Sequence, residues 1–113
     1  MSQRVRDWYA RNRLEQRRKA RERQAHYRSF NQRLRRLILS ARPCADCNEP
    51  PDHEAPFEFD HRVDIGAGSQ RRISDLIAKG TSAAALLREI ALCDVVCPTC
   101  HKRRTYLRAG WSQ

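Results

Sequence analysis

Two Cys-x-x-Cys pairs, far apart in the sequence, constrain the fold of this chain more than any other feature. The first pair is Cys44 and Cys47, and the second is Cys97 and Cys100. This spacing is typical of a four-thiolate zinc site, in which two turns hold one tetrahedral ion. Such a site leaves no open position for water, so we expect the zinc to be structural. The alternatives are ordinary core cysteines or redox cysteines, and the repeated spacing favours zinc over both.

The segment from residue 43 onward is short for a self-sufficient core, and domains of this size commonly need a metal or a disulfide. The arginine-rich N-terminus lacks the apolar run of a secretory signal peptide, which favours a reducing compartment and a metal. No apolar stretch approaches the length of a membrane span. The sequence therefore predicts a cytoplasmic protein with no membrane partner.

The positive charge of the chain is concentrated at its N-terminal end. Residues 1–42 contain 14 Lys/Arg and 3 Asp/Glu, whereas residues 43–113 contain 9 Lys/Arg and 10 Asp/Glu. A basic block of this kind is typical of a surface that binds phosphates, and arginine grips phosphate oxygens with a forked pair of donors. We therefore predict two domains, a basic arm (1–42) and a metal-stabilised domain (43–113). Within the arm, the candidate DNA-binding residues are Arg17, Arg18 and Arg21.

The arm has the composition of one long helix. Residues 3–41 contain no Pro or Gly and are rich in good helix formers, so we expect a helix that ends before Pro43. Its second half has apolar residues at helical spacing, which predicts a packed face. That face comprises Tyr27, Phe30, Leu34, Leu37, Ile38 and Ala41. The alternative to DNA binding is contact with a partner protein, including a second copy of this chain, and the two are compatible.

The remaining residues predict a mixed α+β fold built from short elements. Alternation and flanking turn residues indicate strands over 57–60 and 94–97. Capping serines and helical patterns predict three helices: one that Ser74 caps and that runs through Lys79, one from Ser82 to about Leu92, and one between Pro98 and Arg108. Gly80 would end the first of these, Asn48 would take a left-handed conformation after the first cysteine pair, and residues 66–69 would form a loop.

A second group of metal-binding residue types accompanies the cysteines. Asp60 and His61 end the first expected strand, and His101 directly follows Cys100. Because zinc would tie the two segments together, we expect these three side chains to converge. One carboxylate with imidazoles suits an open divalent-cation site. The alternative is an ordinary hydrogen bond at a strand end.

These residues resemble a known family. Phe59-Asp60-His61-Arg62, followed by the run from Glu89 to Thr105 that contains Cys97-Pro98-Thr99-Cys100-His101-Lys102, is similar to the HNH endonucleases. The similarity is greatest to the zinc-stapled kind found in bacteriophages and bacteria, and it covers about residues 43–106. It implies a bacterial host cell, with a phage as one source of the gene.

The resemblance implies a ββα-metal finger, stapled by the four-cysteine zinc site and preceded by the long basic arm. Asp60 and His101 would hold one divalent cation, and His61 would be the general base. The asparagine of the family motif is missing, since no Asn follows Asn48. Asp94 is the nearest candidate to orient His61, and a backbone carbonyl is the alternative.

The implied activity is metal-dependent hydrolysis of phosphodiester bonds in DNA. The donor set favours Mg²⁺ or Mn²⁺, with Ni²⁺ or Co²⁺ as substitutes. The basic residues that flank the site would hold phosphates, or would form a solvated basic face: Arg62, Lys102, Arg103 and Arg104. Two other readings stay open, a zinc-dependent DNA-binding module without cleavage and a phage packaging accessory protein.

Overall fold

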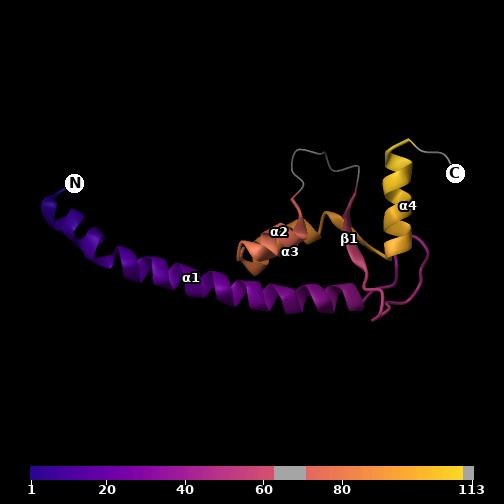
Figure 1. The fold of residues 1–113 in the computed structure, drawn as a ribbon, viewed down its shortest axis with the longest axis horizontal. Coiled ribbons are helices and arrows are strands. Elements are labelled where there is room, and N and C mark those ends of the chain that lie inside the picture. Colours follow the sequence, from indigo (N-terminus) through magenta and orange to yellow (C-terminus); the bar gives the residue numbers. More distant parts are fainter. Residues whose placement is uncertain (63–70, 111–113) are drawn as a thin grey trace.

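The computed structural model describes residues 1–62 and 71–110. It contains long and short helices with one two-stranded sheet, which agrees with the expected mixture of α and β elements (Figure 1). The loop expected over residues 66–69 lies outside the described residues. In chain order the elements are α1 (Gln3–Ser40), β1 (Glu58–His61), α2 (Ile73–Ala78), α3 (Ala83–Ile90), β2 (Cys93–Val96) and α4 (Pro98–Arg108).

Helix α1 dominates the shape of the molecule. Its 38 residues span about 57 Å at 1.5 Å per residue, and the whole chain measures 68 × 30 × 17 Å. Ser2 caps the helix by accepting a hydrogen bond from the Val5 amide at 3.2 Å. The N-terminal half projects beyond every other element, and only the C-terminal half runs beneath α2, α3 and the sheet (Figure 1). The helix expected over 3–41 is therefore confirmed.

The C-terminal half of α1 is fixed by close contacts with the turn between α2 and α3. The Asn31 amide is fully buried and donates to the Thr81 carbonyl at 2.7 Å. Gly80 has a φ of +71°, and a Cβ there would lie 2.7 Å from the Gln24 carbonyl oxygen. Only glycine fits this approach without a shift of the backbone. Gly80 also ends α2, as expected.

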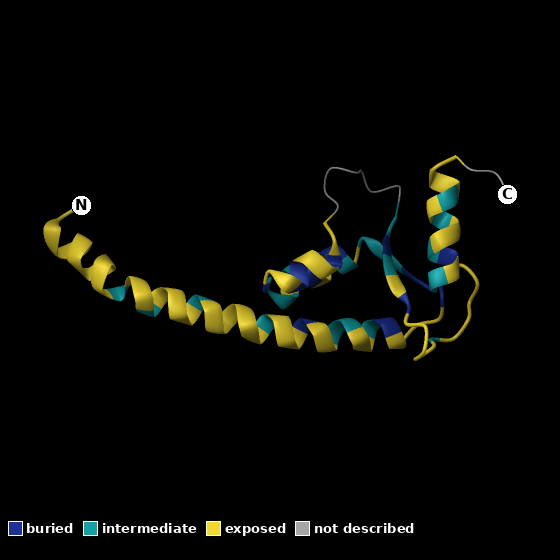
Figure 2. Cartoon of the chain, in the orientation of Figure 1, coloured by how far each residue is buried: buried dark blue, intermediate teal, exposed yellow. Residues whose placement is uncertain are grey.

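The packed face of α1 is narrower than its apolar pattern predicts. Leu34 and Ile38 pack against the two core clusters, and Leu39 is buried. Phe30 and Leu37, expected on this face, are 41% and 68% exposed. The elements above α1 are short, and the covered strip is correspondingly narrow. Figure 2 shows the same contrast along the helix, with buried residues only toward its C-terminal end.

The two strands pair in antiparallel register, with Asp60 opposite Asp94 and His61 opposite Cys93. Phe59 points from this sheet toward both hydrophobic clusters. One cluster joins α1 to the cysteine turns, and the other holds α2 and α3 together. The first comprises Leu39, Cys44, Phe57, Val95, Val96 and Cys100, and the second comprises Ile73, Leu76, Ile77 and Leu86.

Of the two serines predicted to cap short helices, one caps its helix and the other does not. Ser82 caps α3 by accepting from the Ala85 amide at 3.3 Å, as expected. The prediction that Ser74 caps α2 is wrong, because α2 starts at Ile73 and Arg72 is its N-cap without a side-chain bond. The helix therefore starts two residues earlier than a Ser74 cap would allow, which places Ile73 inside the helix with its side chain buried in the core. Within the described part of the chain, no helix has the length and apolarity needed to cross a membrane.

Candidate functional site

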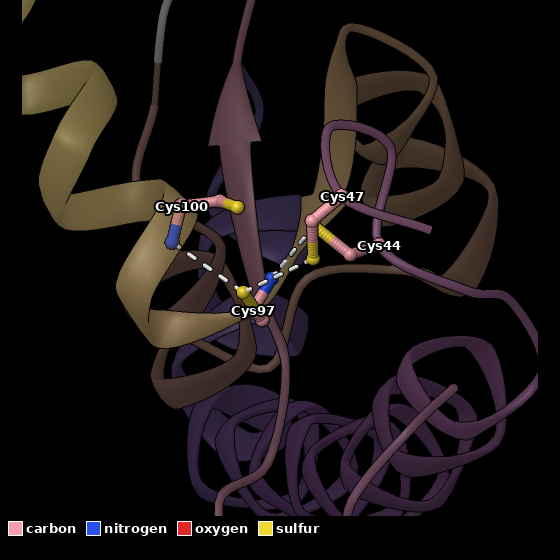
Figure 3. A group of neighbouring side chains, drawn as sticks. All are labelled: Cys44, Cys47, Cys97 and Cys100. Carbon is pink, nitrogen blue, oxygen red and sulfur yellow. Dashed lines mark hydrogen bonds between the residues drawn. The ribbon is translucent and has the colours of Figure 1, made fainter. Parts of the chain in front are cut away.

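The four cysteines of the two pairs meet at the junction of β2, α4 and the turn that follows α1. Their sulfur atoms all lie within 4.8 Å of one another, and the side chains of the two pairs face each other (Figure 3). The Sγ atoms of Cys47 and Cys97 are 3.9 Å apart. A tetrahedral zinc ion with Zn–S bonds of about 2.3 Å separates its sulfur ligands by about 3.8 Å. The cluster therefore has the donor set and the spacing of a four-thiolate metal site.

Local backbone geometry builds this cluster. Asn48 has a φ of +62°, the left-handed conformation expected for it, and its amide donates to the Cys44 carbonyl. The Ala45 amide donates to the Val95 carbonyl at 2.9 Å, which ties the turn to β2. Cys97 is the N-cap of α4, where its sulfur accepts from the Cys100 amide. Each cysteine pair thus occupies a turn whose backbone hydrogen bonds help to orient its sulfurs.

Hydrogen bonds to its sulfur favour the thiolate form of one cysteine in the cluster, Cys44. Burial acts to raise the pKa of Cys44, but backbone amides that point at its sulfur outweigh burial and lower the pKa to about 6. Two of them belong to Asp46 and Cys97, at 3.4 and 3.3 Å. By contrast, a hydrogen bond with Cys97 and burial raise the pKa of Cys100 to about 12. Thiolates are the species that bind metal, so the same amides would favour metal binding.

Cys93 lies apart from this cluster. It belongs to β2, is half-buried, and its thiol donates to the Glu89 carbonyl at 3.5 Å. Burial and the neighbouring carboxylate of Glu89 raise its pKa to about 11, which keeps the thiol protonated and unreactive.

The second group of predicted residues meets between β1 and α4. Asp60 is 5% exposed, and its Oδ1 atom lies 3.4 Å from Nε2 of His101. The other ring nitrogen of His101 pairs with the Glu58 carboxylate. Glu58 and Asp60 are two residues apart on β1, so both side chains point toward α4. The structure therefore brings Asp60 and His101 together.

Two arginines from α4 also bind Asp60. Arg108 donates from both terminal nitrogens to the two carboxylate oxygens at 2.7 Å, and Arg104 donates to Oδ2 at 2.9 Å. Arg104 also bonds Asp46 and Asp94. Burial acts to raise the pKa of Asp60, but Arg108 and Arg104 outweigh it and hold the pKa below its usual value. Asp60 is therefore a buried, ionised carboxylate.

The separation of Asp60 Oδ1 and His101 Nε2 is one that two neighbouring ligands of a divalent cation can have, although arginines occupy both oxygens of Asp60. Ligand bonds of about 2.1 Å place adjacent oxygen and nitrogen donors about 3.0 Å apart in an octahedron and about 3.4 Å apart in a tetrahedron. The observed separation is 3.4 Å. A cation at this position would have to displace Arg108 from Oδ1, where its Nη1 donates at 2.7 Å.

His61 faces the opposite side of β1 from Asp60, so the expected convergence of three side chains is wrong for His61: only Asp60 and His101 meet. Its Nε2 lies 2.9 Å from Oε1 of Glu89, and this carboxylate oxygen also accepts from the Arg71 amide at 2.8 Å. Burial acts to raise the pKa of Glu89, but the Arg71 amide and His61 outweigh it and keep the pKa below its usual value. The carboxylate on His61 is thus Glu89. Asp94, expected to orient His61, is bonded to Arg104 instead.

A small cavity of about 210 Å³ lies along the outer edge of β1. Glu58 and Phe59 point to opposite sides of the strand, and both line the cavity together with His61. In the described part of the chain the sheet has only β1 and β2, so this edge of β1 is unpaired. His61 and Phe59 line the cavity from one face of the strand and Glu58 lines it from the face that carries Asp60, whereas Asp60 and His101 themselves do not line it.

The basic residues predicted to hold phosphates differ in how far they are already engaged. Arg62 donates to the Ala91 and Cys93 carbonyls and lies 3.8 Å from Asp94, and Arg104 serves three carboxylates. Lys102 and Arg103 are exposed on α4, with the Lys102 ammonium 5.9 Å from the Tyr106 ring centre. The three arm arginines (Arg17, Arg18 and Arg21) are exposed on the projecting half of α1, where Arg18 pairs with Glu15 and Glu22.

Sequence reasoning missed three residues of this region: Glu58, Glu89 and Arg108. Glu58 could have been found from strand alternation, which places it on the same face as Asp60. Glu89 had a weaker signal, as the only acidic residue within the expected helix over 82–92. Arg108 lies one helical turn beyond Arg104, so a single helix places both beside Asp60.

Comparison of this protein with protein-family models, with curated proteins and with solved structures found no match. The functional proposals below therefore rest on the residues and their geometry.

Proposed function

We propose that this protein is a metal-dependent DNA endonuclease of the HNH type. The observation that carries the proposal is the 3.4 Å contact between Asp60 of β1 and His101 of α4. His61 directly follows Asp60 in the sequence. A two-stranded antiparallel sheet followed by a helix, with a four-cysteine cluster at its base, supports the same assignment. The basic block at residues 1–42 supports DNA as the substrate.

His61 is the proposed general base. Its Nε2 faces the Glu89 carboxylate at 2.9 Å, so the ring proton resides on Nε2 and Nδ1 is left as an acceptor. A neutral imidazole of this tautomer takes a proton from water near pH 7. Glu89 acts as a positioning residue, since it fixes the tautomer and the ring orientation. Glu89 thereby takes the orienting role that the asparagine has in the family and for which Asp94 was the candidate from the sequence.

Asp60 and His101 are the proposed ligands of the catalytic cation, Mg²⁺ or Mn²⁺. When bound, such an ion supplies Lewis-acid stabilisation of the phosphate and of the leaving oxygen. Glu58 holds the His101 ring through its other nitrogen, which leaves Nε2 directed at Asp60. The four cysteines carry the separate structural zinc, which would hold α4 and β2 in register.

The test is cleavage of supercoiled plasmid in Mg²⁺, Mn²⁺, Ni²⁺ or EDTA. We expect nicked or linear DNA only with added metal, and a rate about 10²–10⁴-fold lower for His61→Ala. His53→Ala is the matched control, because His53 is exposed and lies outside the site. Cleavage that persists in His61→Ala at the wild-type rate would rule out the proposed base.

A second candidate is a zinc-dependent DNA-binding module without cleavage. One observation favours it: both oxygens of Asp60 are already bound by Arg104 and Arg108. Mn²⁺ titration of the wild type and of Arg108→Gln separates the two candidates. Binding that depends on Asp60 and tightens in Arg108→Gln supports the nuclease, whereas no binding to either protein, with DNA affinity retained, supports the module.

A further inference from the structure

Two arginines at the edge of β1 differ from those around Asp60. Arg35 of α1 and Arg72, the N-cap of α2, line the same cavity as His61. Within residues 1–62 and 71–110, neither side chain has an ion pair or a hydrogen bond. Arg62, Arg104 and Arg108 are all engaged by carboxylates or carbonyls. Of the described arginines that line this cavity or contact Asp60 and Asp94, only Arg35 and Arg72 are therefore left without a partner among the described residues.

Burial makes the case sharper for Arg35. Arg35 is half-buried, whereas its neighbour Arg36 on α1 is exposed. An arginine held at the wall of a cavity has fewer positions open to it than one on a free surface, so less side-chain freedom is lost when it binds a ligand there. Among the described residues that line the cavity, only Glu58 carries a carboxylate, and that group pairs with His101. The cavity is therefore lined by two arginines, and no described residue supplies an anion to either of them.

The guanidinium groups of Arg35 and Arg72 indicate which kind of ligand the cavity would bind. Guanidinium groups bind phosphate oxygens through two parallel hydrogen bonds, which are stronger than neutral ones. At about 210 Å³, the cavity holds several times the roughly 30 Å³ that one water molecule occupies in the liquid. A phosphate group with some of its hydration fits such a space.

We propose that Arg35 and Arg72 form a phosphate-binding site at the edge of β1, which holds a backbone phosphodiester of nucleic acid against His61. This inference rests on the proposed nuclease function for its substrate. It assigns α1 a second role: the projecting half carries charge along DNA, and the packed half supplies a wall of the site itself. The arm and the site are then one continuous binding surface.

The test uses the full, zinc-loaded chain without a divalent cation. NMR follows the His61 ring and the arginine side-chain N–H groups during titration with inorganic phosphate, and then with a short DNA duplex. We expect saturable shifts at His61 and Arg35 with both ligands. Shifts with phosphate but not with the duplex would overturn the assignment to nucleic acid.

Substitutions then measure the contribution of each arginine. Arg35→Gln and Arg72→Gln should each weaken duplex binding by roughly tenfold or more, as expected for a lost hydrogen bond to a charged group. Arg33→Gln is the matched control, since it removes the same charge from an exposed position two residues away on α1. Arg35→Lys, which keeps the charge, should restore part of the affinity. Unfolding midpoints confirm that each variant is folded.

The outcomes separate this inference from the nuclease proposal. If Arg35→Gln and Arg72→Gln behave like Arg33→Gln while plasmid is still cleaved, the phosphate site is wrong and the nuclease stands. If phosphate shifts His61 and both variants abolish that shift, yet no metal supports cleavage, the site stands and the nuclease is wrong.

Discussion

The two halves of α1 are alike in sequence and different in what surrounds them. Both are rich in arginine and glutamine, and both belong to one uninterrupted helix. The half near residues 24–40 contacts Gly80, Thr81 and the core, whereas the half before it is exposed along nearly its whole length (Figure 2). Helix propensity therefore does not decide which half is fixed. A few tertiary contacts do: Gln24 and Asn31 contact the turn between α2 and α3, and Leu39 packs in the cluster that contains Cys44 and Cys100.

Loss of the metal should have the largest effect on this contrast. If the four cysteines bind zinc as proposed, its removal breaks the link between the turns that carry Cys44 and Cys100, so we expect the region from residue 43 onward to unfold. Structural zinc contributes about 10–16 kcal/mol of apparent binding free energy in small domains. The measurement is thermal unfolding followed by circular dichroism, with a zinc chelator or with Cys44→Ser.

Cys93→Ser is the control for that experiment, because Cys93 lies outside the cluster. It should leave zinc content at one ion per chain. A cooperative transition that survives chelation unchanged would show that the cysteines act only as core residues.

Removal of Arg104 should have the next largest effect. Its guanidinium joins Asp46, Asp60 and Asp94, and its side chain is only 19% exposed. In Arg104→Gln three carboxylates are left close together, which should cost about 2–3 kcal/mol of unfolding free energy. Arg103→Gln, an exposed neighbour, should change little. Equal denaturant midpoints for the two variants would contradict the central role of Arg104.

Substitution of Gly80 tests whether the packed half of α1 depends on the close approach of Gln24 to the turn between α2 and α3. In Gly80→Ala the new Cβ would lie 2.6 Å from the Gln24 Cβ, in a residue with a φ of +71°. We expect a loss of about 2 kcal/mol or more in unfolding free energy. Gly110→Ala is a matched control, because Gly110 has a φ of +79° and no neighbour within 4 Å of a Cβ. The difference between the two variants isolates the contact from the conformational strain.

Glu89 contributes to stability in a pH-dependent way. Its pKa is lower in the folded protein than the ordinary value of 4.5. Its contribution is thus fully present above about pH 4.5 and is lost as the pH falls through the depressed folded-state pKa. Glu89→Gln should lower the unfolding free energy by about 1 kcal/mol at pH 7. The deficit should shrink on acidification; a deficit that does not change between pH 7 and pH 3 would contradict the ionised state.

The sequence predicts local features of this molecule better than it predicts partners. The cysteine turns, the left-handed Asn48 and the Ser82 cap each depend on a few neighbouring residues, and the structure confirms them. The partner of His61 depends on how α3 packs against β1, so the sequence favoured Asp94 where the structure has Glu89.

The predicted packed face of α1 was too wide for a related reason. Apolar spacing marks every residue that can be buried, and Phe30 and Leu37 satisfy it as well as Leu34 does. Which of them is covered depends on the length and position of α2 and α3, and this information lies outside the helix. The mixed α+β class was predictable because it needs only the types of the elements and their order.

The smallest effect on stability should come from the projecting half of α1. Arg18 pairs with Glu15 and Glu22 on the helix surface, and exposed pairs of this kind contribute little because water and salt screen them. Arg18→Ala should therefore leave the unfolding midpoint of the protein unchanged, unlike Arg104→Gln, Gly80→Ala and Glu89→Gln. If this half binds DNA, the same variant should reduce the slope of log affinity against log salt by about 0.9. A shifted unfolding midpoint with an unchanged salt slope would contradict this contrast between the two halves of α1. It would mean that the projecting half contributes to the folded core and does not bind phosphates.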